Sequence, residues 1–170
     1  MKRVSTIFLK IAVVLSSTIF LKIAVALIGI PVLALCILGL PWLANNPVSP
    51  DYAHILYPIL IGMYVSVIPF FVALYQAFKL LNYIDKNQAF SELSVKALNN
   101  IKFCAMTICA LYVVIMPFVY RVADLDDAPG LIIVGMVPAF ASMVTAVFAA
   151  VLQKLFKNAI DIRLENDLTI

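Results

Sequence analysis

Four long apolar runs restrict the folds that this chain can adopt. They cover approximately residues 23–44, 55–78, 103–120 and 131–153. A helix rises 1.5 Å per residue and the hydrocarbon core of a bilayer is about 30 Å thick, so about 20 apolar residues are enough to cross it. The strands of a membrane barrel would alternate polar and apolar residues, which these runs do not do. The sequence therefore predicts an all-α, polytopic membrane protein with four transmembrane helices.

The composition leaves no room for a separate soluble domain. The chain is 65% apolar and 12% charged, whereas a soluble domain is about half apolar and a quarter charged. We therefore expect a cytoplasmic or interfacial segment at 1–22 and a single transmembrane domain at 23–170. Within that domain, a cytoplasmic loop is expected at 79–102 and a cytoplasmic tail at 154–170.

The basic residues divide unevenly between the two sides of this domain. Eleven of the twelve Lys and Arg residues fall on one side, and Arg121 alone falls on the other. Because basic flanks of membrane spans are retained in the cytoplasm, both termini are predicted to be cytoplasmic, in a multi-pass protein of the plasma membrane. These residues are scattered rather than gathered on one face, so we expect the bilayer as a partner and no direct binding of nucleic acid.

The N-terminal segment contains a duplication. The nonapeptide STIFLKIAV occurs at 5–13 and again at 17–25. A first span that began in the first copy would place Lys22 inside the hydrocarbon, at a cost of about 3 kcal/mol. Starting the span after Lys22 avoids this cost and leaves two places for residues 5–21. They form either a short amphipathic helix in the interface or an extension of the first helix.

The inner loop is predicted to contain a second short amphipathic helix that continues into the third span. Ser91 is a suitable N-cap, and Glu92 would lie in the electropositive first turn. This helix is either an elbow that orients the third span or a surface for a cytoplasmic protein partner. The candidate interaction residues are Lys96, Asn99, Asn100 and Lys102.

The outer loop before the fourth span contains the one concentrated charged cluster, formed by Arg121, Asp124, Asp126 and Asp127. Carboxylates suit hard cations, so one interpretation is an extracellular cation or ligand site. The other is an acidic loop in which Arg121 pairs with a neighbouring aspartate.

The fourth span carries two stripes of small residues, spaced four apart. Such stripes let helix backbones approach closely, either within the bundle or between two copies in an oligomer. The stripes are Ala141, Thr145 and Ala149, and beside them Ser142, Ala146 and Ala150.

The sequence contains no recognisable catalytic or metal-binding pattern. No acidic residue or His lies in the central part of a predicted span, and the three cysteines lack metal or redox spacing. We therefore expect a protein that is not an enzyme, with no cofactor and no metal site.

The inner loop resembles the signature of a bacterial four-helix membrane family, the domain of unknown function 2975. The matching residues are Ile84-Asp85, Ala89-Phe90-Ser91, Ser94-Val95, Ala97-Leu98 and Ile101-Lys102. The resemblance implies a plasma-membrane protein without an assigned activity. Members are often encoded beside a small helix-turn-helix regulator, which implies a membrane partner for a transcription factor.

Two hypotheses about function follow. The first is a non-enzymatic membrane protein that acts through cytoplasmic interactions, with a helix-turn-helix regulator as partner. The alternative is a transporter of small molecules or peptides, a channel or an immunity factor, working as an oligomer.

Overall fold

The computed structural model describes residues 2–45, 53–86 and 88–168, and this part of the chain is helical apart from short connections. Four helices are long and apolar enough to cross a membrane, which confirms the predicted all-α class and the number of spans. The elements are α1 (Lys2–Ala34), a π-helical turn η1 (Leu35–Gly39), α2 (Leu40–Asn45), α3 (Ala53–Asp85), α4 (Glu92–Leu125) and α5 (Gly130–Leu168).

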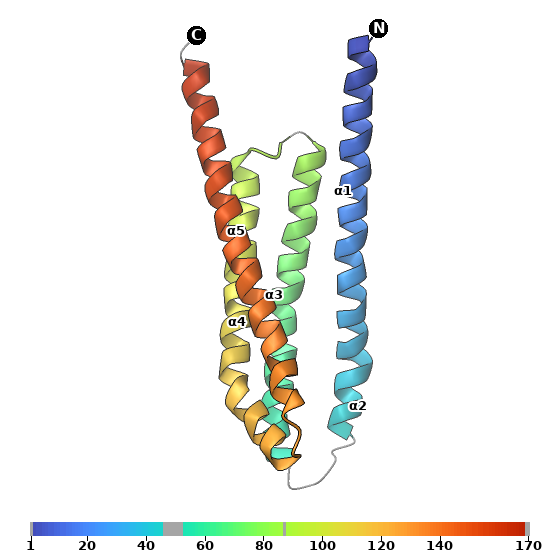
Figure 1. The fold of residues 1–170 in the computed structure, drawn as a ribbon, viewed down its shortest axis with the longest axis vertical. Coiled ribbons are helices and arrows are strands. Elements are labelled where there is room, and N and C mark those ends of the chain that lie inside the picture. Colours follow the sequence, from blue (N-terminus) through green and yellow to red (C-terminus); the bar gives the residue numbers. More distant parts are fainter. Residues whose placement is uncertain (1, 46–52, 87, 169–170) are drawn as a thin grey trace.

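The long helices pack in chain order and do not close into a ring. The helix α3 packs against α1 on one side and α4 on the other, and α5 packs against α4. No comparable packing joins α1 to α5 within the described part of the chain. Both ends of the chain lie on the same side as the connection between α3 and α4 (Figure 1).

The two short amphipathic helices that the sequence predicted are not separate elements. Residues 2–34 form one continuous helix, so both copies of the duplicated nonapeptide belong to α1. This is the second of the two alternatives, an extension of the first helix. Likewise, α4 begins in the inner loop and runs without a break to Leu125.

The start of α4 is fixed by the serine that the sequence predicted as its N-cap. The Ser91 side chain accepts a hydrogen bond from the backbone N–H of Ser94, as N-caps do. The Ser94 side chain is fully buried, and its hydroxyl donates to the carbonyl of Gln88 at 3.2 Å. These bonds hold the inner connection against the start of α4.

Glycines and other small residues set the distances between neighbouring helices. A Cβ atom at Gly62 of α3 would lie 2.3 Å from Cδ1 of Ile115 on α4, so the close approach of these helices requires glycine. On α5, Ser142, Ala146 and Ala149 are all less than 10% exposed. The predicted packing of the second stripe within the chain is therefore supported at Ser142 and Ala146, whereas Ala141 and Thr145 of the first stripe are exposed.

Candidate functional site

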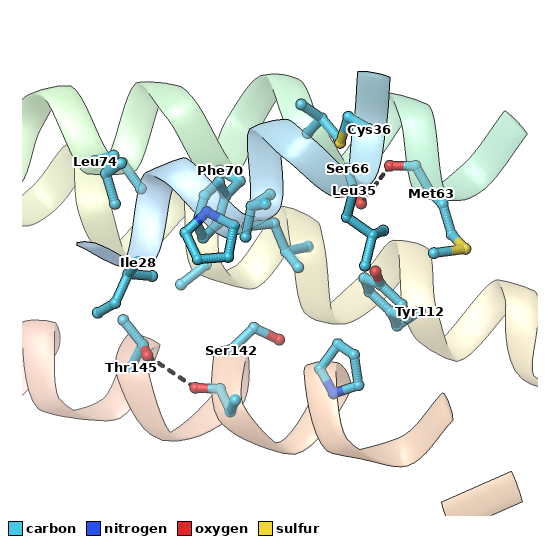
Figure 2. A pocket seen from close by; sticks show the side chains of 18 of the residues that line it. Ile28, Leu35, Cys36, Met63, Ser66, Phe70, Leu74, Tyr112, Ser142 and Thr145 are labelled. Atoms are coloured by element: carbon cyan, nitrogen blue, oxygen red, sulfur yellow. Dashed lines mark hydrogen bonds between the residues drawn. The ribbon is translucent and has the colours of Figure 1, made fainter. Parts of the chain in front are cut away.

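The candidate site is a cavity of about 610 Å³ in the gap that α1 and α5 leave open. All four long helices contribute to its lining (Figure 2). The α5 side of the gap presents small side chains, including Ala141 and Thr145, which do not reach across to α1. Larger apolar side chains form the remaining walls, among them Ile28, Leu35 and Phe70.

The hydroxyl groups of the lining differ in their hydrogen bonds. Three of them donate to a carbonyl about one turn earlier in their own helix, at 2.7–2.9 Å, and belong to Ser66, Ser142 and Thr145. Such local bonds satisfy a hydroxyl within an apolar environment. The fourth, on Tyr112 of α4, also lines the cavity. It makes no hydrogen bond to any residue that the structure describes.

Among the described residues that line the cavity there is no acidic residue, basic residue or His. A charged group would therefore have no counter-ion in this apolar space, and its desolvation would be costly. The arrangement can bind a neutral, mostly apolar molecule, and it offers one hydrogen-bond donor to that molecule. This site was not predicted from the sequence, because the gap depends on how α1 and α5 are placed.

The inner end of α1 is held by an ion pair with α3. The Lys22 ammonium contacts the carboxylate of Asp85, the last residue of α3, and each side chain is about a quarter exposed. Thr18, one turn before Lys22, is 4% exposed. Lys22 was predicted to mark the start of the first span, but its acidic partner was not predicted.

The outer end of α1 is held by a hydrogen bond to the π-helical turn. The Tyr64 hydroxyl of α3 donates to the backbone carbonyl of Cys36 at 3.2 Å. In a π-helix, the partner of this carbonyl would be the nitrogen of residue 41, but Pro41 has no N–H. Tyr64 therefore supplies a donor that the backbone lacks.

Gly29 provides a third contact between α1 and α3, midway between Lys22 and Cys36. A Cβ atom at this position would lie 2.8 Å from Cδ2 of Leu74 on α3. Lys22, Gly29 and Cys36 are seven residues apart, so they lie along one face of the helix. This spacing is the signal in the sequence from which the docking face of α1 could have been identified.

The predicted cytoplasmic interaction residues do not form one exposed surface. Lys102 donates to the side-chain oxygen of Gln153 on α5 at 3.1 Å, and the Gln153 amide donates to Asn99 at 3.2 Å. Asn99 and Lys102 thus connect α4 to α5. Asn100 is partly buried, and only Lys96 is exposed.

Arg121 shares a hollow of about 380 Å³ with His54, at the start of α3. Arg121 forms no salt bridge with the aspartates that follow it, so the predicted pairing is not observed among these described residues. Nor does any group of three acidic, His or Cys side chains in this part of the chain lie close enough to hold a metal ion.

The aspartates instead end α4. Asp126 is the C-cap, and Asp127 adopts a left-handed backbone conformation with φ of 49°. The N–H of Ala128 then donates to the carbonyl of Ala123 at 2.9 Å, as in a Schellman motif. Asp tolerates this conformation better than most residues other than glycine, which gives Asp127 a structural explanation. Asp124 is exposed.

Comparison with known proteins identifies relatives but no activity. Residues 42–170 match the family described as "Protein of unknown function (DUF2975)". The chain is 63% identical, over the full length of both proteins, to a protein of Bacillus subtilis (strain 168) named "Uncharacterized membrane protein YoaS". No solved structure matches the chain.

Proposed function

The chain belongs to the DUF2975 family, whose function is unknown, and we propose that it is a non-enzymatic plasma-membrane protein that acts through its cytoplasmic end. It is a membrane protein with four candidate spans. The proposal concerns its orientation, its lack of catalytic activity and the kind of partner that it binds.

Exposed aromatic residues and the charge distribution support the orientation. Trp42, Tyr57 and Tyr120 are more than half exposed, near the ends of their helices, where an aromatic belt would lie. Lys22 on α1 and Asn100 on α4 precede Trp42 and Tyr120 by about 20 residues each, which corresponds to about 30 Å of helix. The basic residues beyond this level favour the cytoplasm.

The observation that carries the proposal is the extension of α1 and α5 beyond the connection between α3 and α4 (Figure 1). If Lys22 lies at the inner boundary, the part of α1 that precedes it, about 20 residues or roughly 30 Å of helix, projects from the membrane, and only the remainder up to Ala34 lies within it. The projecting part of α5 carries exposed basic side chains at Lys157 and Arg163, and Lys96 is exposed at the start of α4. Together these elements form a helical surface that exposes basic side chains beside Asp161 and Glu165 of α5, and it suits a cytoplasmic protein with complementary charges.

The family resemblance gives this partner a candidate identity, a helix-turn-helix regulator. Asn99 and Lys102 contribute less than the sequence analysis expected, because they hold α5. We therefore assign the contact to Lys96, Lys157 and Arg163.

Photo-crosslinking in intact cells tests this proposal. A photoreactive amino acid at position 96 or 157 should give a covalent adduct that mass spectrometry identifies as a DNA-binding regulator. The matched control is the same substitution at Asp124, which is exposed at the opposite end of α4. Charge reversal by Lys157→Glu and Arg163→Glu should reduce the adduct formed at position 96. Adducts with lipid alone, or solute flux through vesicles containing only this protein, would support the transporter or channel alternative instead.

A further inference from the structure

We propose that the cavity between α1 and α5 is a binding site for a neutral, elongated lipid with one oxygen that accepts a hydrogen bond from Tyr112. This site is independent of the cytoplasmic partner. It is inferred from the length of the cavity, its depth and the hydrogen bonds of its lining.

The length of the cavity suits an extended apolar chain. Along α4 the lining extends from Ile101 to Tyr112, a length of about 16 Å at 1.5 Å per residue. An apolar chain that lies along this wall can place an oxygen at its Tyr112 end. A helix of a second copy in the gap would instead block labelling of the lining in the experiment below.

The depth of the cavity indicates that its occupant comes from the bilayer. The four helices that line it are the four candidate spans, and its lining residues lie within those spans. Its open side is the gap between α1 and α5, which faces the region of lipid chains. A molecule can therefore enter sideways from the membrane.

The hydrogen bonds of the lining define the polar group of the occupant. The hydroxyls of Ser66, Ser142 and Thr145 already donate to carbonyls of their own helices. Tyr112, which is partly buried, is the lining hydroxyl without a partner among the described residues, and its phenol can donate to an oxygen of the occupant. Because the lining has no cationic side chain, a hydroxyl or carbonyl oxygen suits this position and a carboxylate does not.

Photolabelling of the full chain tests the site. The protein is reconstituted in vesicles of phosphatidylethanolamine and phosphatidylglycerol and labelled with a long-chain alcohol that carries a diazirine on its chain. Peptides of α1, α4 and α5 that line the cavity should be labelled, and excess unlabelled long-chain alcohol should compete. A diazirine alkane of the same length without oxygen, and the corresponding fatty acid, should label these peptides more weakly.

Two variants and one control locate the bound probe. Ala141→Phe fills the cavity and should remove the competed labelling. Val147→Phe adds the same ring to an exposed position outside the lining and should leave it unchanged. Tyr112→Phe should reduce labelling by the alcohol roughly fivefold, to the level of the alkane, because one hydrogen bond is lost.

Tyr112→Phe removes only the phenolic hydroxyl, so it still tests the site if Ala141→Phe does not fold. Equal labelling by alcohol and alkane, unaffected by competition and by Tyr112→Phe, would show that ordinary lipid chains fill the gap and would overturn the proposal.

Discussion

The Lys22 ammonium of α1 is paired with the Asp85 carboxylate at the end of α3, at the level where the first span was predicted to begin. The polar contacts of Lys102 with Gln153, and of Gln153 with Asn99, join α4 to α5 near their own predicted inner boundaries. Interhelical polar contacts thus lie at this end of the bundle and, through Tyr64 and Cys36, near the opposite end, and the cavity between α1 and α5 lies in the apolar region between them.

Reversing either charge of the Lys22–Asp85 pair should loosen the inner end of α1. We expect Lys22→Glu and Asp85→Lys to lower the thermal unfolding midpoint of the purified protein, because each places like charges in contact. The double exchange restores an opposite pair and should recover most of the loss. Lys79→Glu is the control, since Lys79 is exposed and has no salt bridge within the described residues. If the unfolding midpoint of the double variant falls by the sum of the decreases seen in the two single variants, the pair does not hold α1.

Introducing a side chain at Gly62 should separate α3 from α4. In Gly62→Ala, the new Cβ would lie 2.3 Å from Cδ1 and 2.7 Å from Cγ1 of Ile115, which is 6% exposed. Overpacking of this kind costs about 1–3 kcal/mol in free energy of unfolding, which detergent titration can measure. Ile115→Ala removes the clashing atoms and should make Gly62→Ala much less costly.

Gly130→Ala is the matched control for this experiment. A Cβ atom at Gly130 would meet nothing within 4 Å. The free energy of unfolding of the Gly130→Ala variant should therefore stay within about 0.5 kcal/mol of that of the unmodified protein. A cost at Gly130 equal to that at Gly62 would mean that helix packing is not the cause.

The hydrogen bond from Tyr64 to Cys36 should matter only while residue 41 is a proline. We expect Tyr64→Phe to cost about 0.5–1.5 kcal/mol, because it leaves the Cys36 carbonyl without a donor. In a Pro41→Ala background, the new backbone N–H can bond within the helix, and Tyr64→Phe should then cost less. Infrared spectroscopy of protein with an isotope-labelled Cys36 carbonyl reports the loss and recovery of this bond directly. An unchanged carbonyl band in Tyr64→Phe would contradict the assignment.

The sequence was sufficient to predict some parts of this structure and not others. The spans follow from apolar runs, and the N-cap at Ser91 follows from local chemistry, because both are properties of a short segment. The role of Asn99 and Lys102 was not predictable in this way, since it depends on Gln153, about fifty residues later in the chain. The cavity is harder still to predict, because it results from helices that do not pack together.

Replacing Gln153 should loosen α5 from α4 at the inner end. Gln153→Leu leaves the Lys102 ammonium without its acceptor and the Asn99 oxygen without its donor, at a cost of about 1 kcal/mol. Gln153→Glu keeps an acceptor for Lys102, and the Asn99 amide can reverse to donate to it, so this variant should be as stable as the unmodified protein. The free energy of unfolding in detergent distinguishes them. Equal losses for Leu and Glu would show that the contact depends on the neutral amide itself rather than on an acceptor for Lys102.

The proposed orientation can be tested with single cysteines at the two ends of the bundle. After Cys36, Cys104 and Cys109 are replaced by alanine, a cysteine is introduced in place of either Phe90 or Asp127, both of which are exposed. A membrane-impermeant maleimide added to intact cells should label position 127 and not position 90, because the basic side of the protein is retained in the cytoplasm. In inverted membrane vesicles the pattern should be reversed, which controls for the reactivity of each thiol. Labelling of position 90 in intact cells would place the basic ends of the helices outside, and the proposed cytoplasmic partner could then no longer reach Lys96 and Lys157.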